Sequence, residues 1–117
     1  MTKEFKYITR IYYEDTDAGG VVYYANYLKF LERARSEAIY SLGFSNKELL
    51  DKEGIIIIVK SCNIEYKKPA KFEDEIQIIS KINEVKNSSF KMHQIIKKNI
   101  TIISEADVLL VTVNKEG

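Results

Sequence analysis

The stretch 12-YYEDTDAGGVVYYANYLKFLERAR-35 marks the point where the pattern of the sequence changes. Before it, residues 5–13 alternate large side chains with basic ones, which predicts a first strand. From about Tyr24 onward, apolar residues recur at three-and-four spacing, which predicts an amphipathic helix that ends just before Gly43. The predicted apolar stripe of this helix consists of Tyr27, Leu28, Leu31, Ala34, Ala38, Ile39 and Leu42.

The chain after Gly43 is predicted to be mostly strand. Ser45 and Glu48 form a capping-box pattern, which predicts a short helix over 46–53 that stops at Gly54. The breaks between the later segments are short, which favours antiparallel neighbours in a meander. One long helix against such a sheet is an α+β fold, expected as a single domain over residues 1–117. The four predicted strands are 55–66, 74–85, 88–98 and 100–113.

The composition excludes several classes of function. The net charge is +1 and lysines outnumber arginines 15 to 3, so the footprint of a nucleic-acid-binding protein is missing. The longest apolar run, residues 55–59, is far shorter than the roughly 20 residues of a membrane span, so no integral membrane segment is expected. The N-terminus lacks the apolar region of a secretory signal, and Cys62 is the only cysteine. These features predict a cytoplasmic protein.

The acidic loop before the helix can be interpreted in three ways. As a calcium loop it would place Gly19 and Asn26 where an EF-hand has ligand oxygens, so no metal site is expected. As a plain helix entrance it needs only one aspartate near the positive end of the helix. As a reaction site it would use the main chain of Gly19 and Gly20 for close approach and the helix N–H groups to hold an oxyanion.

A reaction site of this kind would depend on a carboxylate. His93 is the only histidine and Cys62 the only cysteine, so neither a serine–histidine pair nor a metal cluster is expected from the sequence. A carboxylate beside a carbonyl carbon can attack that carbon or deprotonate a water. The sequence thus predicts that any hydrolysis would use an aspartate and backbone dipoles.

The segment YYEDTDAGGVVYYANYLKFLERARSEAI, residues 12–39, closely resembles the signature of the hotdog-fold acyl-CoA thioesterases. It is most similar to the hydroxybenzoyl-CoA thioesterase family and its Tol–Pal-associated bacterial branch, and residues 59–78 continue the resemblance more loosely. The resemblance implies a curved antiparallel sheet of about five strands wrapped around one central helix. It also implies an acyl-CoA substrate, homodimers or homotetramers with active sites at the subunit interface, and no metal or redox cofactor.

The resemblance assigns roles to individual residues. Asp17 matches the catalytic carboxylate, acting as nucleophile or as general base toward water. Tyr24 matches the start of the helix, whose backbone N–H polarises the thioester carbonyl. Asp15 matches a further acidic position, with a structural role or a helper role in catalysis. The expected substrate-binding residues are Gly19, Gly20, Val22, Tyr23, Lys60, Ser61 and Lys68.

The chain also departs from the family pattern. The Tol–Pal-associated branch usually has histidine where this chain has Tyr24, and family members often continue further at the C-terminus, so the chain is either truncated or naturally short. One alternative is therefore a scaffold of low activity that binds a protein partner or an acyl-carrier protein. A second is hydration or dehydration of an acyl thioester, which needs a histidine near the helix start. Acyl chain length, aryl preference and the choice between CoA and carrier protein stay open.

Three further expectations concern side chains outside the loop. Tyr27 is expected in the core because it falls on the apolar stripe. His93 is expected at the surface of its strand, and Cys62 is expected to be a small packed side chain. Arg33 and Arg35 are expected to form ion pairs with Glu32 or Glu37 on the same helix, the alternative being an arginine at a dimer interface.

Overall fold

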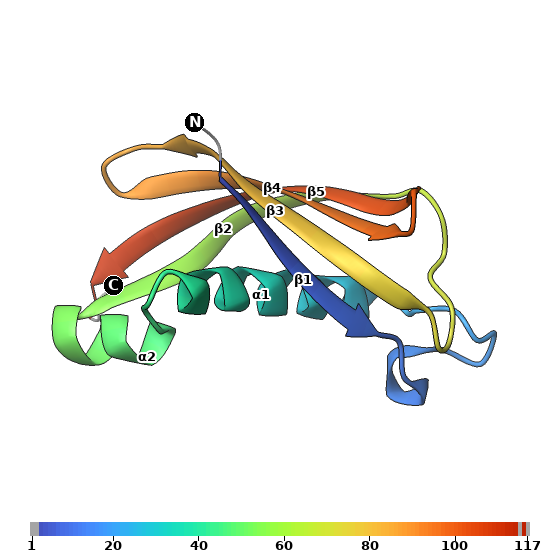
Figure 1. The fold of residues 1–117 in the computed structure, drawn as a ribbon. Helices are drawn as coiled ribbons and strands as arrows, with labels where there is room; N and C mark the ends of the chain where they lie inside the picture. Colours follow the sequence, from blue (N-terminus) through green and yellow to red (C-terminus); the bar gives the residue numbers. More distant parts are fainter. Residues whose placement is uncertain (1–2, 115, 117) are drawn as a thin grey trace.

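The computed structural model describes residues 3–114 and 116 and shows an antiparallel sheet packed over one long helix (Figure 1). The α+β class predicted from the sequence is confirmed. No helix in the described part of the chain is both long and apolar enough to span a membrane. The elements in chain order are β1 Glu4–Arg10, a 3-10 turn Tyr13–Asp15, α1 Tyr24–Ser41, α2 Asn46–Glu48, a π-helical turn Leu49–Glu53, β2 Ile55–Tyr66, β3 Glu75–Val85, β4 Ser89–Lys98 and β5 Thr101–Asn114.

The boundaries of most elements agree with the sequence patterns. α1 begins at Tyr24, and Gly43 follows its end with a φ of +91°, as expected of a glycine after a helix. The Ser45 hydroxyl accepts a hydrogen bond from the Glu48 N–H at 3.0 Å, so the predicted cap is present. The first strand was predicted too long: it ends at Arg10, because the chain then turns into the 3-10 segment.

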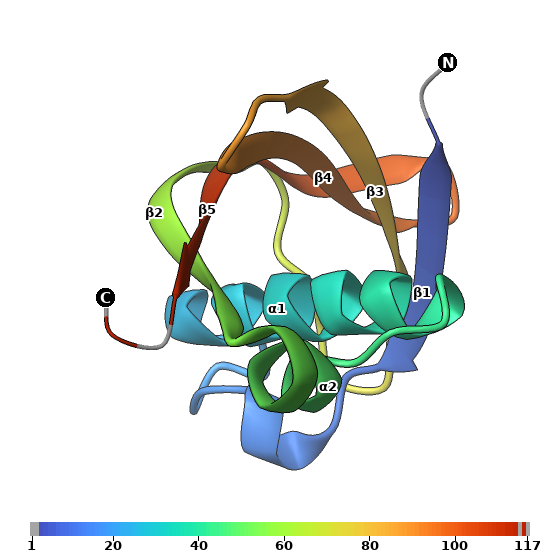
Figure 2. The ribbon, with the colours of Figure 1, turned by 90° about the vertical axis from the view of Figure 1, so that its left-hand side faces the viewer.

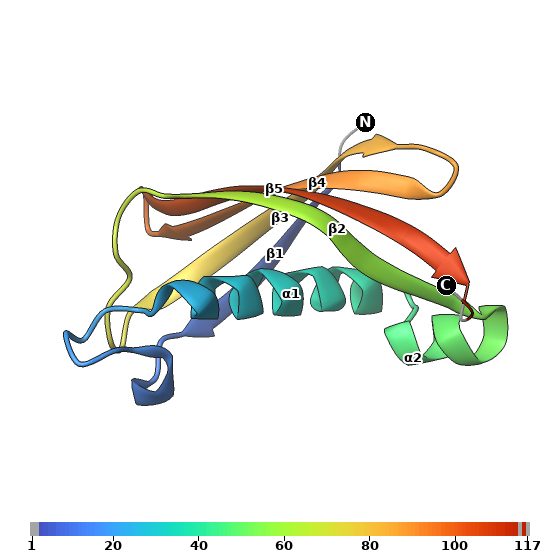
Figure 3. The same cartoon turned by 180° about the vertical axis from the view of Figure 1, so that it is seen from behind.

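The order of the strands corrects the predicted meander. The sheet runs β1-β3-β4-β5-β2, so only β3, β4 and β5 follow one another as hairpins. β2 pairs with β5, the last strand, and not with β3, its neighbour in sequence. The connection over residues 67–74 leaves the sheet at one edge, passes β5 and β4, and returns three strand positions away (Figure 3). Eight residues reach roughly 26 Å when extended, which exceeds the roughly 15 Å across three strand spacings.

The core lies between α1 and the concave face of the sheet (Figure 2). Tyr27, Leu31, Ala34 and Ala38 of the predicted stripe are buried, together with Phe30. Two members of the predicted stripe, Leu28 and Leu42, are exposed instead. The sheet supplies the facing layer of side chains, which includes Ile76, Ile78, Met92, Ile96, Ile103, Ala106, Val108 and Leu110.

Candidate active site

The loop between β1 and α1 is fastened to the first turn of the helix by Asp15. This residue is 8% exposed, and its carboxylate accepts a hydrogen bond from the Tyr12 N–H at 2.9 Å. Its main-chain oxygen accepts from Asn26 Nδ2 at 2.8 Å and from the Tyr23 N–H at 3.2 Å. The side chain of Asp15 therefore shapes the loop, while its carbonyl ties the loop to the start of α1.

Asp17 is an exposed carboxylate of the loop. Its Oδ1 accepts a hydrogen bond from the Gly19 N–H at 2.8 Å, which fixes the direction of the carboxylate. Its Oδ2 accepts no hydrogen bond from any residue between 3 and 114. The main chain of Asp17 pairs with Val21 across the loop, through the Asp17 N–H and the Val21 carbonyl at 2.9 Å. One carboxylate oxygen is thus held in place and the other is available for reaction.

The two glycines meet different requirements. Gly20 has a φ of +79°, in the left-handed region that other residues enter only with strain, and its N–H donates to the Asp17 carbonyl at 3.0 Å. Gly19 has no positive φ, but a Cβ there would lie 3.3 Å from Asp17 Oδ1. Gly20 is therefore needed for the turn, and Gly19 for the space beside the carboxylate.

The N-terminus of α1 opens next to this turn. The Tyr24 N–H is the first of the helix and donates no hydrogen bond to any described residue. Such free N–H groups at a helix N-terminus carry partial positive charge and can bind an oxygen that becomes negative. The Tyr23 and Tyr24 side chains are 57% and 67% exposed, so both are available to line a surface site.

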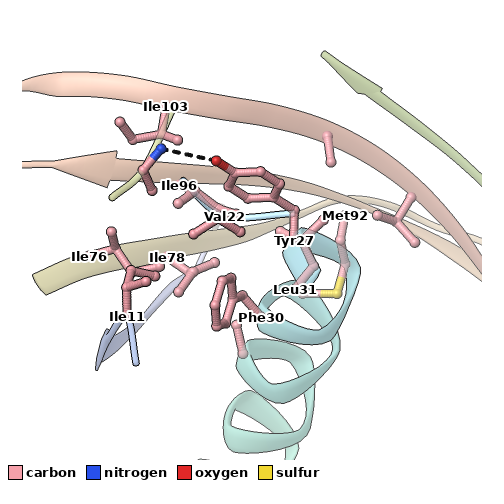
Figure 4. Close-up of a cluster of buried hydrophobic side chains, with 14 of the residues drawn as sticks. Ile11, Val22, Tyr27, Phe30, Leu31, Ile76, Ile78, Met92, Ile96 and Ile103 are labelled. Atoms are coloured by element: carbon pink, nitrogen blue, oxygen red, sulfur yellow. Dashed lines mark hydrogen bonds between the residues drawn. The ribbon is translucent and has the colours of Figure 1, made fainter. Parts of the chain in front are cut away.

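The connector between β2 and β3 holds the loop from the other side. The Val22 N–H donates to the Ala70 carbonyl at 2.9 Å, and the Phe72 N–H donates to the Gly20 carbonyl at 3.1 Å. The Ala70 N–H in turn donates to the Tyr27 hydroxyl at 3.0 Å (Figure 4). Burial keeps the pKa of Tyr27 above its ordinary value although this backbone hydrogen bond lowers it, so the hydroxyl stays protonated. Tyr27 is confirmed as a core residue, and it also anchors the connector.

A groove of about 260 Å³ lies beside Tyr24, between the start of α1 and the end of β2. Its walls are aromatic: the Tyr24 and Tyr66 rings are 5.1 Å apart, and those of Tyr66 and Tyr27 are 5.4 Å apart. Lys68 contributes a charge at the rim, and Val22 contributes apolar surface. Burial raises the pKa of Tyr66 above its ordinary value. Such a groove can hold an apolar chain or ring near the free N–H groups of the helix.

Of the expected substrate-binding residues, Val22 and Lys68 line this groove, whereas Gly19, Gly20, Tyr23, Lys60 and Ser61 do not. Gly19, Gly20, Val22, Tyr23 and Lys68 belong to the loop, the helix start and the connector. Lys60 and Ser61 lie in the middle of β2, where Lys60 is the extra residue of a β-bulge. Ser61 borders a different hollow, of about 520 Å³, together with Asn63, Lys91 and Asp107. Within one copy of the chain, these two residues do not line the groove beside Tyr24.

Two expectations outside the loop have different outcomes. His93 is on the outer face of the sheet, as expected, and its Nδ1 lies 2.8 Å from Asp107 Oδ1. Cys62 is exposed, not packed. Tyr66 was missed by the sequence analysis because its role depends on the position of the β2 end beside Tyr24, and nothing in its local pattern indicates this.

Chemically, the loop combines a carboxylate that has a free oxygen with an unpaired helix N–H and a glycine turn. The carboxylate can attack an electrophilic carbon or remove a proton from water. The N–H can stabilise the oxyanion that forms on the attacked carbonyl. Among the residues that the structure describes, no three His, Cys, Asp or Glu side chains converge as metal ligands. The arrangement fits acyl transfer to water.

Comparison with known proteins gives consistent findings. The sequence profile of the thioesterase superfamily matches residues 19–101. The acyl-CoA thioesterase YbgC of Haemophilus influenzae is 39% identical over 110 residues, covering 94% of this chain and 81% of the relative. The acyl-CoA thioester hydrolase YbgC of Escherichia coli is 40% identical over 114 residues, covering 97% and 84%. A crystal structure of a probable thioesterase from Bartonella henselae matches with a TM-score of 0.94 at 33% identity, covering 98% of this chain and 95% of that one.

Proposed function

The chain belongs to the thioesterase superfamily, and on this premise we propose that it hydrolyses the thioester of a small or medium acyl-CoA to a free carboxylic acid and CoA. The observation that carries the proposal is the Asp17 carboxylate, which is held by Gly19 through one oxygen and free at the other. It lies in the loop that leads into the N-terminus of α1. The names of the two curated relatives support the substrate class.

In the proposed reaction Asp17 and the helix start act on the same carbonyl. Asp17 Oδ2 either attacks the thioester carbon or takes a proton from a water that attacks it. The negative charge that forms on the carbonyl oxygen is held by the Tyr24 N–H, which has no partner in the described chain. The C–S bond then breaks, and the CoA thiolate leaves and takes up a proton. In the attack route, water next cleaves the acyl-aspartate anhydride and restores the carboxylate.

The surroundings of Asp17 have supporting roles in this proposal. Gly19 and Gly20 let the substrate approach the main chain, while Val22 and Tyr23 line the path to the carbonyl. Lys68 at the groove rim pairs with phosphate groups of CoA as a flexible point charge. Hydrolysis of this kind requires no metal or redox cofactor.

We further propose a single hotdog domain over residues 1–117 that works in the cytoplasm as a homo-oligomer. β2 is an edge strand of twelve residues, and its Ile58, Val59 and Tyr66 side chains are between 43% and 45% exposed. A long apolar edge of this kind is normally covered. Antiparallel pairing of two β2 strands covers it and brings Lys60 and Ser61, in the middle of the strand, into the interface near both active sites. Two such dimers can associate into a tetramer.

The test is a hydrolysis assay over short, long and aryl acyl-CoAs and the matching acyl-carrier-protein thioesters, with the wild type, Asp17→Asn and Glu14→Gln. Glu14 is an exposed acid of the same loop, so its variant is a matched control for loss of charge. We expect Asp17→Asn to lower kcat by roughly 10²- to 10⁴-fold and Glu14→Gln to have little effect. A wild type that leaves every thioester of CoA and of acyl-carrier protein intact would contradict the proposal. It would favour a scaffold that binds its partner without turnover.

A further inference from the structure

Arg35 is a half-buried arginine without a carboxylate partner. Its Nη1 donates to Gln94 Oε1 at 3.0 Å, and this is the one hydrogen bond of the guanidinium among the described residues. The ion pairs expected from the sequence are wrong: among the described residues, neither Arg33 nor Arg35 has a side-chain nitrogen within 4.0 Å of a carboxylate oxygen. Burial lowers the pKa of Arg35, while the nearby Cys62 and Glu32 raise it. Four of the five N–H donors of this side chain thus lack a protein acceptor.

Gln94 holds Arg35 in this position from within the core. Gln94 is fully buried, and its Nε2 donates to the Leu31 carbonyl at 3.1 Å and to Ser80 Oγ at 2.9 Å. Both N–H groups of the amide are therefore used, which leaves Oε1 directed at Arg35. A buried network in which every member is satisfied is rigid. The guanidinium is consequently fixed by one N–H, and its other N–H groups donate to no described residue.

Two cavities meet at Arg35. The first, of about 120 Å³, is almost entirely apolar and is bordered by Ile39, Phe90 and Met92. The second, of about 130 Å³, has mixed walls, in which the polar side chains Glu32, Ser36 and Asn46 face apolar ones, and Glu32 adds one negative charge there. An unpaired charge at the boundary of an apolar space costs free energy, and an anion that enters removes this cost. The chemistry around Arg35 therefore suits a small group that carries a carboxylate on an apolar stem.

Within one copy of the chain, the candidate active site at the start of α1 lies far from Arg35. Tyr24 and Arg35 are separated by eleven residues of α1, about 16 Å along the helix, with core side chains between them. Tyr24 lies beside Tyr66, at the end of β2, whereas Arg35 shares a cavity with Ile57 near its beginning. Antiparallel pairing of two β2 strands places the end of one strand opposite the beginning of the other. The helix start of one copy then faces the partner subunit's Arg35.

We propose that Arg35 of the partner subunit binds a carboxylate at the far end of the acyl group, so that the preferred substrates are CoA thioesters of dicarboxylic acids. The inference rests on the proposed hydrolysis and on pairing along β2. A planar guanidinium with free N–H groups matches a carboxylate in two-pronged geometry. The apolar cavity beside it accommodates the methylene stem. Arg35 takes no part in bond breaking: it sets the length and charge of the acyl group that fits.

The experiment compares kcat/KM for glutaryl-CoA and hexanoyl-CoA, which have similar length and differ in the terminal carboxylate. The wild type, Arg35→Met, Arg35→Lys and Arg33→Met are measured, with the oligomeric state of each determined by light scattering. Arg33 is exposed on the same helix and serves as the matched control. We expect the wild type and Arg33→Met to prefer glutaryl-CoA, and Arg35→Met to lose about 10- to 100-fold on glutaryl-CoA alone. Arg35→Lys should retain part of the preference.

Several outcomes would overturn the inference. A wild type that hydrolyses both thioesters equally well refutes it without any variant, even if Arg35→Met does not fold, and leaves the proposed function intact. Retention of the preference in Arg35→Met also refutes it. An equal loss on both substrates, together with dissociation of the oligomer, shows that Arg35 serves assembly instead. A wild type that hydrolyses no thioester refutes the proposed function and this inference with it.

Discussion

Replacing Tyr27 by phenylalanine removes one oxygen atom from the centre of the molecule. The Tyr27 ring is 3% exposed, and its hydroxyl is the acceptor for the N–H of Ala70, a residue that is fully buried. Phenylalanine keeps the ring and its packing against Phe30, so the substitution tests the hydrogen bond alone. The Ala70 N–H is then left buried without an acceptor.

The expected cost follows from this geometry. A buried donor that loses its acceptor destabilises a protein by about 1–3 kcal/mol. For 117 residues the entropy of unfolding is about 0.25 kcal/mol/K, so Tm should fall by roughly 4–12 °C. Because the Ala70 carbonyl accepts from Val22, a shifted connector should also displace the active-site loop and lower kcat.

Thermal unfolding and thioester hydrolysis are measured for Tyr27→Phe beside Tyr40→Phe. Tyr40 lies on the same helix, is 53% exposed, and its variant should match the wild type in both assays. If the Tm of Tyr27→Phe stays within about 2 °C of the wild type, the connector does not depend on this hydrogen bond and the reasoning fails.

Three further predictions concern the loop and the connector. Gly20→Ala should lower the free energy of unfolding by about 1–2 kcal/mol, because φ is +79° and the space around a Cβ is empty, so backbone strain is its only cost. Gly19→Ala should instead leave the urea midpoint unchanged and lower kcat, because its Cβ presses on Asp17 Oδ1. A lower urea midpoint with unchanged kcat would contradict the role assigned to Gly19. Burial raises the pKa of Asp74, but hydrogen bonds from Lys98 Nζ and the Lys71 N–H outweigh it and hold the pKa below 3.8. The stability that ionised Asp74 contributes is therefore full above its ordinary pKa of 3.8 and is lost as the pH falls through the lower pKa of the folded state. In urea unfolding, Asp74→Asn should be less stable than the wild type at pH 7. This difference in stability should shrink below pH 3.8. A difference that does not change with pH would refute the ionic role.

Local patterns were sufficient to predict most of the elements of this fold. The change from alternation to helical spacing at Tyr24, the Ser45 cap and Gly43 each report on a few neighbouring residues, and each was predicted correctly. The partner of β2 was not, because alternation shows which face of a strand is buried but not which strand lies beside it. The pairing of β2 with β5 joins residues far apart in the chain and became visible only in three dimensions.

The same distinction between local patterns and tertiary contacts applies to the residues of the candidate site. The loop and helix start form one continuous segment, so Asp17, Gly20 and Tyr24 could be singled out from sequence. Tyr66 and the connector reach the site only through tertiary structure. Gln94 did leave a signal, because it takes an inward position between Met92 and Ile96, where a polar side chain needs a partner. That partner is Arg35. The spacing of residues on α1 had instead predicted ion pairs between Arg35 and acidic residues of the same helix.

The place of β2 at the far edge of the sheet has a consequence for how the chain is made. Ile55 pairs with Asn114 and Tyr66 with Ser104, so β2 has no strand to join within its own subunit until β5 has been synthesised. During that interval a twelve-residue strand with four consecutive isoleucines stays open on the nascent polypeptide. Closing such long-range pairs makes folding slow and leaves the intermediate prone to aggregation. The edge of β2 that pairs with β5 in the finished chain thus stays exposed until residues 104–114 have been made.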